Sequence, residues 1–265
     1  MLDGTALERV LKRDRAITAL GLVAIASLAW FYTILVASMG SGDMAGAASQ
    51  MAMPQDQPWS GVDFLLMFAM WMVMMVAMML PSAAPMILLF ASANRKRQQA
   101  QDPYLPTLLF AGAYVVVWAG FAVIATLANW ALHSRGLMTS MMGSALPLWG
   151  GGLLMAAGLY QFTPLKLACL NKCRSPLAFL MSEWREGKLG AFVMGLRHGG
   201  YCLLCCWALM ALLFVLGVMN LAWIALLAVL VLIEKLATRG PWLSRASGLL
   251  LIGWGAWMVA SAFPP

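Results

Sequence analysis

Residues 63–90 read DFLLMFAMWMVMMVAMMLPSAAPMILLF, and this stretch decides the fold class. It is longer than the ~20 apolar residues that an α-helix needs to cross the hydrocarbon core of a bilayer. Its only charged residue, Asp63, stands at the start, where a carboxylate caps the amino end of a helix. Pro81 and Pro85 each remove a backbone donor, so we expect a kink or a broken end near them. The stretch predicts a membrane-spanning helix.

Similar apolar runs recur along the whole chain of 265 residues. The chain is 63% hydrophobic and only 10% charged, whereas about a quarter of the residues in a soluble domain are charged. This composition excludes soluble hydrolases, Rossmann dehydrogenases and nucleic-acid enzymes. We expect one integral membrane domain over residues 1–265, an all-α polytopic transmembrane helix bundle. About seven spans are expected, at 17–38, 63–90, 107–130, 147–164, 191–218, 220–238 and 243–262.

The distribution of positive charge predicts the orientation of these spans. Of the 17 Lys and Arg residues, all but Arg135 and Arg197 fall on one side of them. Lys and Arg concentrate in short cytoplasmic segments, so the chain is expected to be N-in/C-out. Topology and anionic lipid headgroups, rather than nucleic acid, therefore explain the net charge of +7. The first apolar run lacks a clear cleavage site, so we expect it to be a retained helix.

The most informative cluster of side chains lies in residues 194–208, which read MGLRHGGYCLLCCWA. On a helix, one face of this segment presents Met194, His198, Cys202, Cys205 and Cys206. Thiolates, thioethers and imidazoles bind Cu(I) and Zn(II), whereas Mg and Ca prefer the carboxylates that the spans nearly lack. The alternative is structural, with the cysteines as small apolar residues and the histidine bonded to a carbonyl.

A second cysteine pair, Cys169 and Cys173, lies in the connection before this segment. If that connection is a short helix, the i, i+4 spacing places both sulfurs on one face. The predicted topology puts the pair on the cytoplasmic side, where all five cysteines can converge. Because the cytosol is reducing, a metal-binding or redox-active pair is favoured over a structural disulfide.

Methionine is the third feature, with 22 residues in the chain. One stripe of the second span carries Met67, Met70, Met74 and Met78, although leucine would fill the same space. Outside the spans lie Met39, Met44, Met51, Met53, Met138, Met141 and Met142, with His133 nearby. Together these residues predict a thioether path that leads a soft monovalent ion from outside to the thiolates. Packing and chance are the alternative explanation.

The fifth and sixth spans each carry a charged residue, Arg197 and Glu234. We expect a mutual ion pair between them, with a proton-coupling role for Glu234 as the alternative. The fifth span is expected to break near residues 197–200 into an interfacial piece and a membrane piece. Gly195 and Gly199 form a GxxxG pattern that favours close helix packing. The very short connection around Asn220 predicts a tight antiparallel hairpin.

The motifs resemble a bacterial family of predicted metal-binding integral membrane proteins, classed as a domain of unknown function. The matching residues, over about 60–240, are MWMVMMVAMMLPSAAPM (70–86), YQFTPLK (160–166), Cys169, CRSP (173–176), HG (198–199), Cys202, CCWALM (205–210), MN (219–220) and EK (234–235). The resemblance implies metal binding within a membrane. A bacterial protein of this kind is expected in the inner, cytoplasmic membrane.

These observations favour a soft-metal-binding protein that transports Cu(I) or delivers it to a membrane cuproenzyme. Zn(II) is a possible ligand because it also accepts Cys and His. The predicted ligand pool is Cys169, Cys173, His198, Cys202, Cys205, Cys206, Met194, Met70, Met74 and Met78. We expect no catalytic residues, and as partners the lipid bilayer, the metal ion and a metallochaperone or membrane complex, but no nucleic acid. The alternatives are a membrane thiol–disulfide electron carrier and a structural or assembly subunit of a larger complex.

Overall fold

The computed structural model describes residues 4–41, 59–97, 104–136, 147–237 and 242–262, without the side chains of 4–12, 39–41 and 147. All the elements described are helices, which confirms the all-α fold class. The helices are α1 (Gly4–Ser41), α3 (Gly61–Arg97), α4 (Tyr104–Ser134), α5 (Pro147–Tyr160), α6 (Pro164–Arg174), α7 (Pro176–Glu183), α8 (Gly187–Ala211), α9 (Leu213–Leu216), α10 (Leu221–Leu236) and α11 (Trp242–Ser261). The outermost methionines that we predicted as a collector lie outside the described residues, except Met39, whose side chain is not described.

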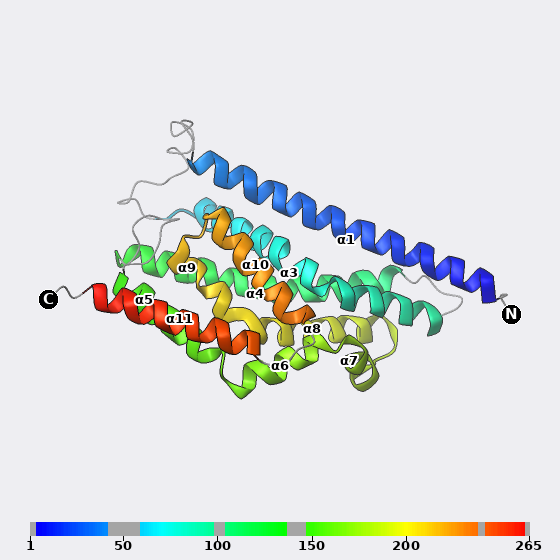
Figure 1. Cartoon of the computed structure of the whole chain (residues 1–265). Coiled ribbons are helices and arrows are strands. Elements are labelled where there is room, and N and C mark those ends of the chain that lie inside the picture. The colour runs from blue at the N-terminus through cyan, green and yellow to red at the C-terminus, as the bar shows by residue number, and fades with distance from the viewer. Residues whose placement is uncertain (1–3, 42–58, 98–103, 137–146, 238–241, 263–265) are drawn as a thin grey trace.

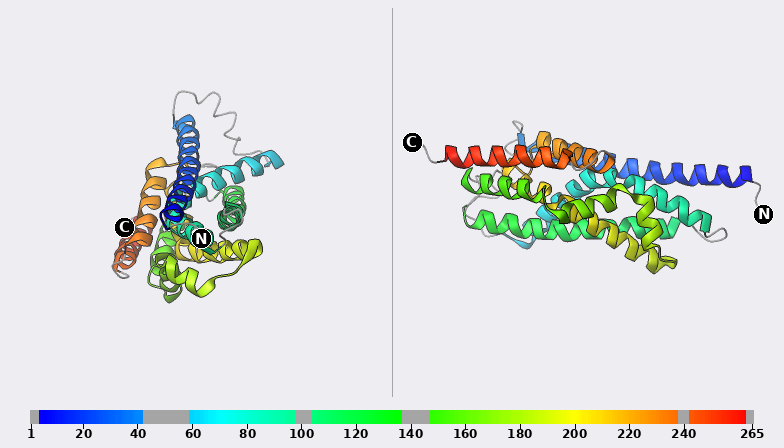
Figure 2. Two further views of the ribbon diagram at one scale, coloured as in Figure 1. Left: turned by 90° about the vertical axis from the view of Figure 1, so that its right-hand side faces the viewer. Right: turned by 60° about the horizontal axis from the view of Figure 1, so that its bottom comes forward.

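The helices run back and forth along one long axis (Figures 1 and 2). The chain passes along this axis in α1, α3, α4, α5, α8, α10 and α11, and its direction alternates from each of these helices to the next. As a result, α1 begins at one end of the bundle and α11 ends at the other. We call the first the basic end, because α3 finishes there with Arg95, Lys96 and Arg97.

Five described helical segments are long and apolar enough to cross a membrane. These are Arg13–Ser38, Gly61–Arg97, Tyr104–Ser134, Gly187–Leu216 and Trp242–Ser261. A sixth span results if α5 and α6, which meet at a bend of 65°, are counted together. α10 has 16 residues, slightly fewer than the usual minimum for a span. The length and apolar composition of these helices therefore identify a membrane protein. The number of seven crossings remains a prediction.

The expected break in α8 is wrong, and α3 has no broken end near its prolines, where a kink stays a prediction. α3 continues without interruption through Pro81 and Pro85. α8 likewise continues through residues 197–200 and ends only at Ala211, before the single turn of α9. The chain reverses at Gly217, whose φ of 90° suits glycine, and Asn220 then caps α10 by accepting a hydrogen bond from its third residue.

Glycine allows two helix pairs to approach closely. A Cβ atom on Gly195 of α8 would lie 2.2 Å from the carbonyl oxygen of Phe110 in α4. A Cβ atom on Gly199, one turn further along α8, would lie 2.9 Å from Cγ2 of Val117 in α4. This contact explains why α8 remains helical through its glycines, and it confirms the close packing predicted from GxxxG. The pair α5 and α11 is locked in the same way by Gly151, Gly158, Gly248 and Gly255.

Candidate metal centre

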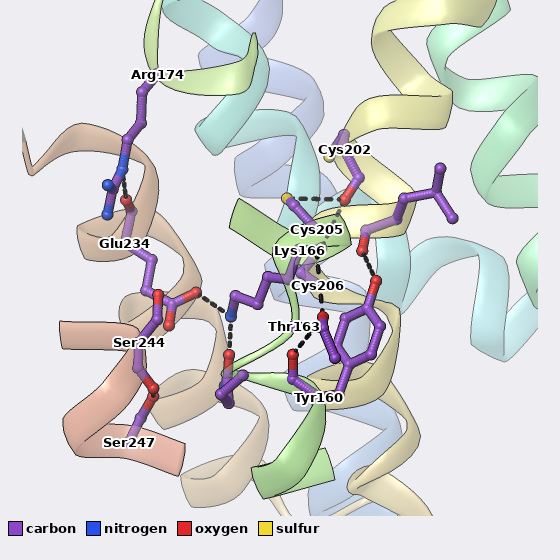
Figure 3. Close-up of polar contacts among 12 residues, drawn as sticks. Tyr160, Thr163, Lys166, Arg174, Cys202, Cys205, Cys206, Glu234, Ser244 and Ser247 are labelled. Carbon is purple, nitrogen blue, oxygen red and sulfur yellow. Dashed lines mark hydrogen bonds and ion pairs between the residues drawn. The ribbon is translucent and has the colours of Figure 1, made fainter. Parts of the chain in front are cut away.

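The three cysteines of α8 are buried in the middle of the bundle, where α8 meets α3, α4 and α10. Cys202, Cys205 and Cys206 are each 1% exposed. Figure 3 shows their side chains on successive turns of one helix. The helical spacing explains this placement, because i, i+3 and i+4 positions share a face. This face is directed toward the core rather than toward lipid.

Cys202 has the most polar surroundings of the three thiols. Lys235 of α10 donates a hydrogen bond to its sulfur over 2.9 Å. The hydroxyl of Tyr114 in α4 lies 3.0 Å from the same sulfur and also donates to the carbonyl oxygen of Met79 at 3.1 Å. Lys235 donates a second hydrogen bond, of 2.8 Å, to Ser82 of α3. Side chains from α3, α4 and α10 thus converge around one sulfur of α8.

Cys206 lies against a thioether. Its Sγ is 3.8 Å from the Sδ of Met79. Two sulfurs bound to one trigonal metal at about 2.3 Å would lie about 4.0 Å apart. The Cys205 and Cys206 thiols both donate to the carbonyl oxygen of Cys202, at 3.1 Å and 3.0 Å. Those bonds keep the two sulfurs close to the helix backbone, and a χ1 rotation would redirect them.

The connection before α8 brings a fourth thiol to this group. The Cys173 thiol is near enough to interact with that of Cys205, which also interacts with the thiols of Cys202 and Cys206. Cys169 lies one turn earlier on α6 and is an electrostatic neighbour of Cys205. Within the ranges that the structure describes, no three Cys, His, Asp or Glu side chains form a closed metal site. The thiols are therefore adjacent without forming a coordination sphere of their own.

A cavity of about 100 Å³ opens beside these thiols. It is lined by Ser82, Pro85, Met86, Cys173, Arg174, Pro176, His198, Lys235 and Leu236. His198 is 3% exposed and lies among the rings of Phe110, Tyr114 and Phe179. Its Nδ1 has no hydrogen-bond partner among the described residues. An imidazole and a thiol thus meet in one hollow beside the cysteine cluster.

The predicted methionine ligands are all buried, in different settings. Met70, Met74 and Met78 lie in the same apolar core as the cysteines of α8. Met194 accepts a hydrogen bond of 3.2 Å from the backbone of Arg185, so its sulfur already has a partner. His133, at the end of α4, lies against Trp59 and far along the helix from Tyr114.

The expected ion pair between Arg197 and Glu234 is wrong. Arg197 pairs with Glu183 of α7 at the surface. Glu234 instead pairs with Lys166 of α6 over 2.8 Å, and both side chains are almost completely buried. Figure 3 shows this pair where Lys166 and Glu234 point toward each other. The prediction failed because a side chain from the short helix α6, which was assigned to a cytoplasmic connection, enters the bundle.

Sequence reasoning missed four residues of the site. Lys235 was counted among the cytoplasmic charges, and Met79 lay outside the predicted stripe. Tyr114 and Ser82 were not singled out, because neither carries a charge or a soft ligand. The signal that could have revealed Lys235 is the pair Glu234-Lys235 within an apolar helix. Adjacent residues on a helix point about 100° apart, so each of the two charges needs its own partner.

Buried thiols and a thioether lie together within helices long enough to span a membrane, and both are donors that suit a soft metal. The PpoB2 family, described as copper chaperones, matches residues 68–258. The chain belongs to this family, and its function is copper binding and delivery. No curated protein and no solved structure matches the chain.

Proposed function

We propose that the chain binds Cu(I) through Cys202, Cys206 and Met79 and delivers it from within the membrane. The contact of 3.8 Å between Cys206 Sγ and Met79 Sδ carries this proposal. It joins α8 to α3 through two soft sulfurs in a buried place. Cys202, one turn before Cys206, supplies the third sulfur.

The chemistry of these three groups favours Cu(I) over other metals. Thiolates and thioethers are soft donors, and a thioether is a poor ligand for Zn(II), which prefers Cys, His and carboxylates. Three donors suffice for a monovalent copper ion. Cys205 and Cys173 then form a second set of thiols that receives the ion by exchange of one sulfur at a time.

The arrangement of sulfurs along α3 supports a path for the ion. Met67, Met70, Met74 and Met78 follow one another toward Met79, and a helix rise of 1.5 Å per residue makes this path about 18 Å long. The cavity with Cys173 and His198 is also lined by Pro85 and Met86, which follow Met79 along α3 toward the basic end. Copper would therefore pass between the two ends of the bundle through sulfur and imidazole ligands.

We further propose that the protein lies in the bacterial inner membrane, N-in/C-out, with seven crossings. The alternating helices support an odd number of crossings, because α1 begins and α11 ends at opposite ends of the bundle. The basic end would then face the cytoplasm. The recipient would be a copper enzyme in or beside the same membrane.

The test is anaerobic purification in detergent, loading with Cu(I), and measurement of bound copper by mass spectrometry. Cys202→Ser, Cys206→Ser and Met79→Leu should lose or weaken copper binding, while X-ray absorption of the unmodified protein should report sulfur neighbours. Cys169→Ser is the matched control, because it removes a buried thiol outside the proposed trio. Copper that stays bound in both Cys202→Ser and Cys206→Ser would place the site elsewhere.

A further inference from the structure

Lys235 is a buried cation directly beside the proposed copper ligands. Its side chain comes from α10, it is 6% exposed, and its ammonium donates to Cys202 and Ser82. The preceding residue, Glu234, faces away and pairs with Lys166. Among the ion pairs of the described residues, none joins Lys235 to a carboxylate. The positive charge of Lys235 is thus directed at the sulfur of Cys202.

A fixed positive charge in this position makes the site sensitive to the charge of the metal. Cysteine ligands lose their protons when they bind a metal, so Cys202 and Cys206 would contribute two negative charges and Met79 none. With Cu(I), the metal, two thiolates and Lys235 sum to zero. With Zn(II), the same set carries one net positive charge. An uncompensated charge is costly in a buried, poorly polarisable environment.

We propose that Lys235 is the residue that selects a monovalent over a divalent metal at the Cys202–Cys206 site. This inference rests on the proposed function, because it takes those cysteines as the ligands. Lys235 remains hydrogen-bonded to Cys202 when copper is bound, since a thiolate accepts both a metal and a hydrogen bond. It acts through the sulfur, as groups around a metal ligand do.

The first test compares Lys235→Gln with the unmodified protein in competition titrations against chromophoric chelators of Cu(I) and of Zn(II). Removing the charge should weaken Cu(I) binding and strengthen Zn(II) binding, changing the ratio of the two Kd values by about 10- to 100-fold. Lys235→Arg keeps the charge and should keep the preference for copper. Lys188→Gln, at an exposed position of α8, controls for a general loss of positive charge.

A second pair of variants tests the same charge while Lys235 remains in place. Ser82 Oγ lies 2.8 Å from the ammonium, so Ser82→Asp would neutralise Lys235 locally. In the matched variant Ser82→Asn, the asparagine side chain has nearly the same size as aspartate but carries no charge. Ser82→Asp should shift the preference toward Zn(II), and Ser82→Asn should not. This pair decides the question if Lys235→Gln does not fold.

The outcomes separate this inference from the proposed function. In one outcome, the unmodified protein binds Cu(I) through Cys202 and Cys206, but neither Lys235→Gln nor Ser82→Asp changes the ratio of the Cu(I) and Zn(II) Kd values. Lys235 then does not select the metal. If the unmodified protein does not bind Cu(I) there at all, the proposed function fails and the inference falls with it. A shift toward Zn(II) in Ser82→Asp and not in Ser82→Asn supports the inference.

Discussion

Tyr114 touches both helices of the proposed copper site, α3 and α8. Its hydroxyl lies 3.0 Å from Cys202 Sγ and donates to the carbonyl oxygen of Met79. We predict that Tyr114→Phe weakens Cu(I) binding by roughly tenfold, because it removes one buried hydrogen bond worth about 1–3 kcal/mol. A competition titration with a Cu(I) chelator measures the change.

Tyr104→Phe is a suitable control for this experiment. Tyr104 belongs to the same helix and donates a hydrogen bond of 2.8 Å to Asp14, at the basic end. The substitution removes the same hydroxyl at a place without sulfur, so copper affinity should not change. Equal copper affinities in the two variants would contradict a role for Tyr114 at the site.

The second prediction at the scale of single residues concerns the ion pair of Glu234 and Lys166 and its effect on stability. Both side chains are at most 1% exposed, so removing one partner leaves an unpaired buried charge. Glu234→Gln should destabilise the protein by about 3–5 kcal/mol. The measurement is thermal unfolding in detergent, followed by helical circular dichroism.

Two further variants identify the cause of that loss. Arg197→Gln breaks the ion pair with Glu183, in which the arginine is 44% exposed, and it should cost less than about 1 kcal/mol. The double variant Glu234→Leu with Lys166→Met removes both charges and should recover most of the stability. A double variant as unstable as Glu234→Gln would show that packing, not charge, is responsible.

At the scale of helices, the contact between α4 and α8 determines whether the site is assembled. Gly195→Ala would place a Cβ atom 2.2 Å from the carbonyl oxygen of Phe110, so the helices must separate. We expect a loss of about 1–3 kcal/mol of stability together with weaker copper binding, because Tyr114 would move away from Cys202. Gly200→Ala is the matched control, since nothing lies within 4 Å of the added carbon. Similar losses in both variants would indicate lower helix flexibility rather than a clash.

The helices were predictable from sequence because the bilayer fixes their length and composition. The continuity of α8 through residues 197–200 was not, because the preference of glycine is weak beside helix packing, as at Gly195. The face with Cys202, Cys205 and Cys206 followed from helical periodicity alone. The partners of that face were not predictable, because they come from residues distant in sequence, such as Tyr114 and Lys235.

At the scale of the whole molecule, the side of the carboxyl terminus depends on α10. This helix has 16 residues and a length of about 24 Å, against about 30 Å for the hydrocarbon core. Helix lengths alone give five or six crossings, whereas positive charge gives seven. With α5 and α6 counted as one span, the end of α11 lies outside if α10 crosses and in the cytoplasm if it does not.

We predict that α10 crosses, because one face of it is buried in the bundle, and Glu234 and Lys235 near its end bond to α6, α3 and α8. Fusions of alkaline phosphatase and of a fluorescent protein report the side of each position. After Ser261, the phosphatase should be active and the fluorescent protein dark, and after Arg97 the reverse. A fluorescent fusion after Ser261 would make the number of crossings even, and the carboxyl terminus would then share the cytoplasmic side with the basic end.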